Sequence, residues 1–232
     1  MLKKGVNQKA LVGLMLFSMF LWGLSWPSGK VLTRYCSPVN IAAYRFAIVF
    51  VTLLILLALR RSRPTVKKAG ISAIIGSGML LATYAIFFFR GLKAGTAGAG
   101  GVLVTTLNPI MSYAIGVLIS RRMPSRNESL GLILGVLAGC VLLKVWDNPM
   151  EILASGNLYF LLAAITWATM SQITSKGSKY GTSLGFSFWQ YLVTMLCLFP
   201  FINGQELIHT VHIRDVYFCG NIFFSSAMFT AI

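Results

Sequence analysis

Acidic residues are scarce in this chain: Asp and Glu together number 5 among 232 residues, and all charged residues amount to 11%. Soluble domains carry about 25% charged residues, so a water-soluble globular domain is excluded. Hydrophobic residues make up 56% of the chain and recur in long uncharged runs. Because about 20 apolar residues are needed to cross a ~30 Å hydrocarbon core as a helix, these runs predict a polytopic membrane protein.

The few acids lie in loops or at the ends of the apolar runs. No carboxylate pair and no Ser/His/Asp set falls within the membrane, so we expect no enzyme. Cysteine is also sparse: Cys36, Cys140, Cys197 and Cys219 lie far apart, with no CxxC motif and no histidine at zinc spacing. We therefore expect no disulfide, no metal site and no cofactor.

Segments of alternating polarity are missing as well, which excludes a porin-like barrel. The apolar runs instead predict an all-α integral membrane protein with about eight spanning helices. The predicted spans are Ala10–Leu32, Ile41–Leu59, Ala69–Phe89, Ala97–Ile119, Leu130–Val145, Gly156–Ile173, Gly185–Ile202 and Val216–Ile232.

Basic residues, by contrast, are abundant and give a net charge of +15. Thirteen Lys and Arg fall at the N-terminus and in the second, fourth and sixth loops, against five in the other loops. Because Lys and Arg near helix ends are retained on the cytoplasmic side, the N-terminus is predicted to be cytoplasmic, in a bacterial inner membrane. We attribute the charge to topology and to attraction by anionic membrane lipid, and we expect no nucleic-acid partner.

A weak internal repeat is present. It aligns Trp22-Gly23 with Trp167-Ala168, and the strongly basic loop Arg60–Lys68 with Gln205–Ile213, which has neither Lys nor Arg. The aligned loops thus lie on opposite sides of the membrane. An odd number of helices in the first unit makes the second unit enter from the other face, as in the inverted repeats of secondary transporters.

Several short motifs follow one another in the order and spacing of a known family. They are Trp22-Gly23-Leu24-Ser25 with Lys30, Pro38 with Arg45-Phe46, Gly91-Leu92-Lys93-Ala94 with Thr96-Ala97-Gly98, Asn108-Pro109, the series Gly131, Gly135 and Gly139, and Trp167-Ala168. In these residues the chain resembles the EamA family of the drug/metabolite transporter superfamily over essentially its whole length. The resemblance implies a ten-helix bundle of two inverted five-helix repeats.

Under this resemblance, residues 1–150 form the first EamA-type repeat, and residues 151–232 form a second repeat that holds three helices of five. The implied function is secondary transport of a small-molecule substrate, such as an amino acid or related solute, by alternating access between the repeats. The alternative is a truncated, non-transporting remnant or an assembly partner of such a transporter. Whether two copies of the chain form a homodimer is left open by the sequence.

Two basic residues, Lys30 and Arg45, lie inside predicted spans and flank the same loop. Charge within the membrane is costly, so such residues are candidate functional sites. Each also lies within about two turns of a helix end, and snorkelling to the headgroups is the simpler explanation. Both roles are kept for these residues.

Aromatic side chains at mid-membrane depth are the other candidates, because Trp walls bind partly apolar organic solutes. Trp22, Ser25 and Trp26 share one helix face, and the repeat places Trp167 at the equivalent depth of the other half. An interfacial Trp belt is the alternative, as is hydrogen bonding between helices for the polar members. The predicted lining of one central cavity comprises Trp22, Ser25, Trp26, Arg45, Trp167 and Gln190, with Tyr84 added from the third helix.

Glycines gather on two of the predicted helices. One group is Gly98, Gly100 and Gly101, and the other is the GxxxG-spaced series at 131, 135 and 139. Such glycines let helix backbones approach each other. We expect both groups to serve helix packing, with room for a substrate as a lesser alternative for the first.

Overall fold

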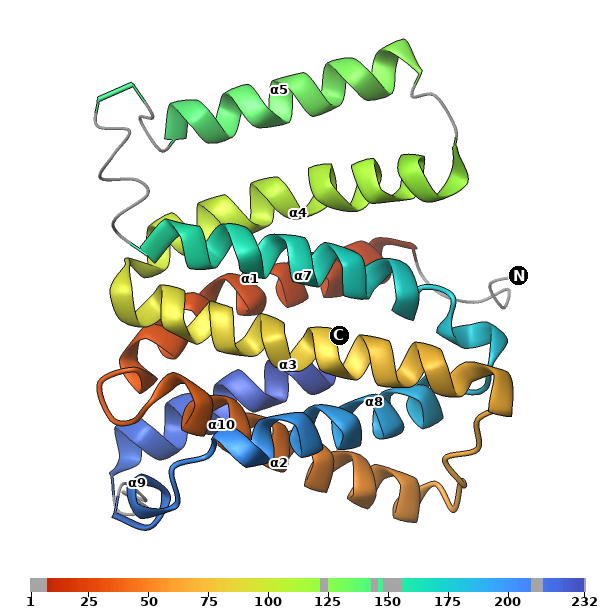
Figure 1. Ribbon diagram of the computed structural model, residues 1–232, viewed down its shortest axis with the longest axis vertical. Coiled ribbons are helices and arrows are strands. Elements are labelled where there is room, and N and C mark those ends of the chain that lie inside the picture. The colour runs from red at the N-terminus through yellow and green to blue at the C-terminus, as the bar shows by residue number, and fades with distance from the viewer. Residues whose placement is uncertain (1–7, 122–124, 143–145, 148–155, 210–214, 232) are drawn as a thin grey trace.

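The computed structural model describes residues 8–121, 125–142, 146–147, 156–209 and 215–231 (Figure 1). Within these ranges the regular structure is helical apart from one isolated bridge, which confirms the all-α class. The long helices are α1 (Gln8–Leu32), α2 (Pro38–Leu59), α3 (Ile71–Ala94), α4 (Ala97–Ser120), α5 (Arg126–Leu142), α7 (Leu158–Thr174), α8 (Ser183–Leu198) and α10 (Val216–Ala231), and α9 (Gly204–His209) is short. Each predicted span coincides with one long helix.

Five of these helical segments are long and apolar enough to cross a membrane, as judged by length and composition. They are Leu11–Leu32, Pro38–Leu59, Lys68–Ala94, Ala97–Ile119 and Ser183–Phe201. The helix α7 and the first part of α10 are apolar but shorter. The last residues of the fifth and eighth predicted spans, 143–145 and 232, lie outside the described residues.

Two predicted helix starts were wrong by three or four residues. The helix α2 begins at Pro38, not Ile41, because proline has no backbone N–H to leave unpaired in the first turn. The helix α5 begins at Arg126, not Leu130. There the Ser125 backbone N–H donates to the Glu128 carboxylate over 2.8 Å, and the Glu128 N–H donates back to the Ser125 hydroxyl, which is a capping box.

The end of the third helix was also predicted too early. The sequence suggested an end at Phe89, since Arg90 follows, but α3 continues to Ala94. The side chains of Arg90 and Lys93 are exposed on this last turn. Long basic side chains on a terminal turn can reach water while the backbone remains helical.

The helices alternate in direction, so their loops gather at two ends of the bundle (Figure 1). The first end, here named the basic end, holds the loops 60–70 and 175–182. The second, named the far end, holds the loops 33–37, 95–96 and 199–203 together with α9. Contacts join segments distant in sequence: α7 packs against α3 and α4, α8 against α2 and α3, and α10 against α1 and α2.

The packing is tight around the first turn of α7. The Phe160 side chain is fully buried and lies over Gly91 of α3 and Gly100 of α4. A Cβ added at either glycine would come within 2.6 or 2.5 Å of the Phe160 ring, closer than real Cβ contacts. Both glycines are therefore required for packing. A Cβ added at Gly139 of α5 would lie 3.1 Å from the Thr106 side chain of α4, so α4 and α5 also approach closely there.

Candidate functional site

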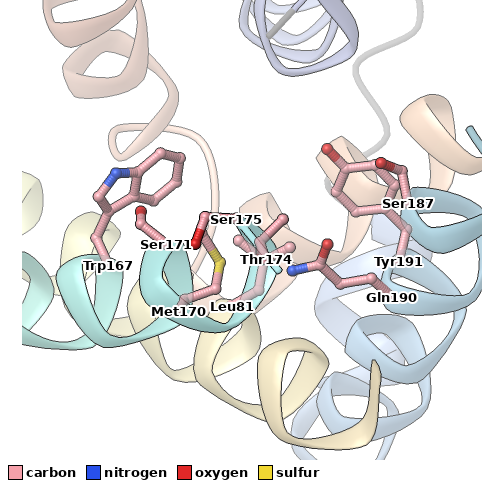
Figure 2. A pocket seen from close by; sticks show the side chains of 9 residues that line it. All are labelled: Leu81, Trp167, Met170, Ser171, Thr174, Ser175, Ser187, Gln190 and Tyr191. Carbon is pink, nitrogen blue, oxygen red and sulfur yellow. The ribbon is translucent and has the colours of Figure 1, made fainter. Parts of the chain in front are cut away.

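A cavity of about 280 Å³ lies between α7 and α8 (Figure 2). The helix α7 contributes four of its lining residues, α8 three and α3 one, while Ser175 follows the last turn of α7. The lining residues are Leu81, Trp167, Met170, Ser171, Thr174, Ser175, Ser187, Gln190 and Tyr191. Since α7 ends and α8 begins at the basic end, the cavity lies in that half of the bundle.

The polar groups of the lining are neutral. They are hydroxyls, the Gln190 amide and the Trp167 indole N–H, and none of the lining residues is Lys, Arg, Asp or Glu. The Gln190 amide extends from α8 toward Thr174 on α7 (Figure 2). The Thr174 hydroxyl is buried and has no hydrogen-bond partner within the described part of the chain. A few donors and acceptors among apolar walls suit a small, partly apolar solute.

Trp167 closes the cavity at the end away from Gln190 (Figure 2). Its ring lies 4.7 Å from that of Tyr84, centroid to centroid, and the Tyr84 ring lies 5.7 Å from Phe88. The Phe88 ring in turn lies 4.9 Å from Trp26. Phe88 therefore contacts both Trp26 and Tyr84, and Tyr84 continues the aromatic chain to Trp167. It was not predicted, although it lies four residues after Tyr84 and so on the same helix face.

Arg45 lies beside the same aromatic cluster. Its side chain is 3% exposed, and its guanidinium carbon is 5.8 Å from the ring centroids of both Phe88 and Phe89. A guanidinium held this close to aromatic faces is stabilised by cation–π attraction. Arg45 is thus buried beside these rings.

Two other predicted residues line a separate groove between α1 and α4. Trp22 and Trp26 line this groove of about 540 Å³ with Gly98 and Gly101. Ser25 is buried, and its hydroxyl donates to the Trp22 carbonyl over 2.6 Å. The structure therefore places Trp167 and Gln190 in one cavity and Trp22 and Trp26 in another. Tyr84 and Arg45 both contact Phe88, which also contacts Trp26.

Lys30 binds the C-terminal turn of α3. Its ammonium donates to the carbonyl oxygens of Leu92 and Gly95 over 2.5 and 2.7 Å. These carbonyls lie at the C-terminus of a helix, where they lack intrahelical partners and where a positive charge is favourable. The contact is a cap that ties α1 to the end of α3.

A polar network that sequence reasoning missed joins α2 to α9 at the far end. The Glu206 carboxylate accepts from the Ser37 backbone N–H over 2.6 Å and from the Asn40 amide over 2.8 Å. Asn40 is fully buried and also exchanges hydrogen bonds of 3.2 Å with the Asn203 backbone. A carboxylate at the N-terminus of α2 is favoured by the helix dipole.

Two titratable groups in the loop 33–37 have raised pKa values. Burial raises the pKa of the Cys36 thiol to about 12, and the charge of Glu206 adds to the effect. The pKa of Tyr35 is also raised, chiefly because its hydroxyl is hydrogen-bonded to Asp215. The Tyr35 ring lies 5.4 Å from that of Phe218 on α10. The far end is therefore closed by contacts between early and late segments of the chain.

Comparison with known proteins places the chain in a family. The model of the EamA-like transporter family matches residues 10–144. The uncharacterized transporter YyaM of Bacillus subtilis (strain 168) is 24% identical over 78% of this chain and 61% of its own length. A probable amino-acid metabolite efflux pump of Salmonella typhimurium is 24% identical over 84% of this chain and 63% of its own length.

A third relative, the uncharacterized transporter YoaV of Bacillus subtilis (strain 168), is 23% identical over 84% of this chain and 67% of its own length. The chain thus spans about three fifths to two thirds of the length of these curated relatives. No solved structure matches the chain significantly. The family match covers more than half of the residues, and the apolar helices agree with it. The chain belongs to the EamA-like transporter family and is a multi-pass membrane protein.

Proposed function

We propose that the protein is an inner-membrane secondary transporter of small, partly apolar metabolites, with amino acids and related solutes as the first candidates. The observation that carries this proposal is the cavity between α7 and α8, which combines a Trp wall with neutral hydroxyl and amide groups. A relative named as a probable amino-acid metabolite efflux pump supports the same solute class.

Inverted repeats are part of the proposal, and the helix contacts support them. In the repeat, α1 is equivalent to α7, α2 to α8 and α3 to α10. The contact of α3 with α7 then corresponds to that of α10 with α1, and the contact of α3 with α8 to that of α10 with α2; all four contacts occur. The contact between α2 and α8 corresponds to itself. Such reciprocity suits two units that rock against each other around a central site.

Alternating access requires a site that is open to one side at a time. The cavity lies in the half of the bundle next to the basic end, while Lys30, Phe160 and the Glu206 network close the far end. We propose that the basic end faces the cytoplasm, as the distribution of Lys and Arg favours. The conformation is then one that receives solute from the cytoplasm.

The test is transport by the protein reconstituted in proteoliposomes, with labelled amino acids and related metabolites presented on either side. Gln190→Leu should lower transport about tenfold or more, because it removes the amide that faces the cavity. Gln172→Leu is the matched control, since the Gln172 amide donates to the Ser112 carbonyl of α4 over 2.9 Å and does not line the cavity.

Normal transport by Gln190→Leu would contradict the assignment of the cavity. Absence of transport for every solute, with folded protein in the bilayer, would favour the non-transporting alternative.

The orientation of the chain has its own test: a Cys at position 62, in the loop at the basic end, should be protected from an impermeant thiol reagent outside the cell. Ready labelling there would contradict the cytoplasmic assignment.

A further inference from the structure

A second apolar groove, of about 510 Å³, lies on the outside of the bundle between α3 and α8. Its walls are Ile71, Ile74 and Ile75 of α3 and Trp189 and Val193 of α8, and Pro64, Thr65 and Val66 close its end. Ile71, Ile75 and Trp189 are 52, 45 and 38% exposed. The groove is separate from the candidate substrate cavity, which opens on the other side of α8 at Gln190.

The loop that closes the groove, residues 60–70, is held in a defined position. Val66 forms a bridge with Gly181, and the Lys67 backbone N–H donates to the Tyr180 carbonyl over 2.8 Å. The Trp189 indole N–H donates to the Pro64 carbonyl over 2.7 Å. A Cβ added at Gly181 would lie 2.7 Å from the Thr65 carbonyl oxygen, so this close approach needs glycine.

This fixed loop carries a dense positive charge at the mouth of the groove. Its five basic residues are all exposed: Arg60, Arg61, Arg63, Lys67 and Lys68. The neighbouring loop 175–182 adds Lys176 and Lys179, and neither loop contains Asp or Glu. Groove and charge therefore meet at the basic end of the bundle.

We propose that the groove between α3 and α8 binds one anionic phospholipid, with an acyl chain along the isoleucines and the phosphate at loop 60–70. The apolar walls account for the chain and the unbalanced cations for the headgroup; basic pockets beside membrane helices bind anionic headgroups in this way. A zwitterionic lipid offers no net charge to the loop. Trp189 joins the two parts, because its ring faces the groove while its N–H is bound to the loop.

The experiment measures quenching of Trp189 fluorescence by lipids with brominated acyl chains, in phosphatidylcholine nanodiscs. A small fraction of brominated phosphatidylglycerol is compared with the same fraction of brominated phosphatidylcholine, and Trp189→Phe protein identifies the Trp189 signal. We expect phosphatidylglycerol to be enriched at Trp189 at least about fivefold, since one basic residue near an anionic membrane surface contributes roughly that factor.

Lys67→Gln with Lys68→Gln should remove most of this enrichment. The matched control, Arg121→Gln with Arg126→Gln, removes two exposed basic residues at the end of α4 and the start of α5 and should leave the enrichment intact. Ile75→Phe, which narrows the groove without changing any charge, should also remove the enrichment, and circular dichroism checks that each variant is folded. Equal quenching by both lipids, or an equal loss in the Arg121/Arg126 control, would overturn the proposal in favour of general surface attraction.

Discussion

The two halves of α7 have very different neighbours. In the half nearer the far end, Phe160, Ala163 and Ala164 are fully buried, and α3 and α4 approach closely through Gly91 and Gly100. In the half nearer the basic end, Trp167, Ser171 and Thr174 line a cavity that separates α7 from α8.

The difference shows how one helix can be closely packed in one half and border a cavity in the other. Glycines opposite Phe160 let three backbones approach, so no space remains there. Opposite Ser171 and Thr174, the cavity is bordered by Ser187, Gln190 and Tyr191 of α8. Along α7 the packing is closed toward the far end and leaves a cavity toward the basic end, which suits one state of the proposed alternating-access cycle.

Removing the Phe160 ring from the tightly packed half of α7 should have the largest effect on stability. Phe160→Ala should lower the free energy of unfolding by about 3–5 kcal/mol, because it leaves a cavity at a fully buried ring. The measurement is unfolding in mixed detergent micelles, followed by circular dichroism. Leu158→Ala, on the same helix but at a residue 49% exposed, should change stability by only about 0.5 kcal/mol. Equal effects of the two changes would mean that the far end is not tightly packed.

Closure of the far end can also be measured at Cys36, in protein whose other three cysteines are replaced by serine. With burial raising the pKa of this thiol to about 12 from an ordinary 9.0, its thiolate is roughly a thousandfold scarcer at pH 8. Alkylation should therefore keep rising about tenfold per pH unit up to pH 11. A rate that levels off near pH 9, as expected for a Cys at exposed position 62, would show that the far end is open.

The Lys30 cap makes a smaller contribution to the same closed end. Lys30→Met removes charged hydrogen bonds to the α3 carbonyls and should cost about 1.5–3 kcal/mol of unfolding free energy. Lys93→Met is the control, since Lys93 is exposed on the same turn. An unchanged stability for Lys30→Met would return Lys30 to the role of a substrate contact or headgroup anchor.

Trp167→Ala tests the half of α7 that borders the cavity. This change should lower transport about tenfold while the amount of folded protein stays near normal, because Trp167 lines the cavity and is only partly buried. A fall in abundance that matches the fall in activity would indicate a packing role. Trp22→Ala in parallel decides whether the groove between α1 and α4 belongs to the same path, in which case transport falls comparably.

The helices could be predicted from the sequence because span length and loop charge are local properties of the chain. The capping box at Ser125 and Glu128 was equally local, and its S-x-x-E pattern could have corrected the start of α5. The Glu206 network could not be predicted, since Glu206 and Asn40 meet only through the packing of segments far apart in sequence.

The lining of the cavity was harder to predict for a related reason. The repeat placed Trp22 and Trp167 at equivalent depth, but equivalent positions in two repeats need not face the same space. In the structure each Trp lines its own cavity. Ser171, Thr174 and Ser187 carried no signal of their own, because hydroxyl side chains in membrane helices commonly bond to neighbouring backbone.

The most direct test of a site open only toward the basic end is cysteine accessibility along α7. In protein without its four native cysteines, Ser171→Cys places a thiol in the cavity and Ala163→Cys places one in the sealed half. An impermeant thiol reagent should label position 171 only from the face that also labels position 62, should be slowed there by a transported solute, and should not label position 163. Labelling of position 171 from the opposite face alone, or equal labelling of both positions, would contradict the account.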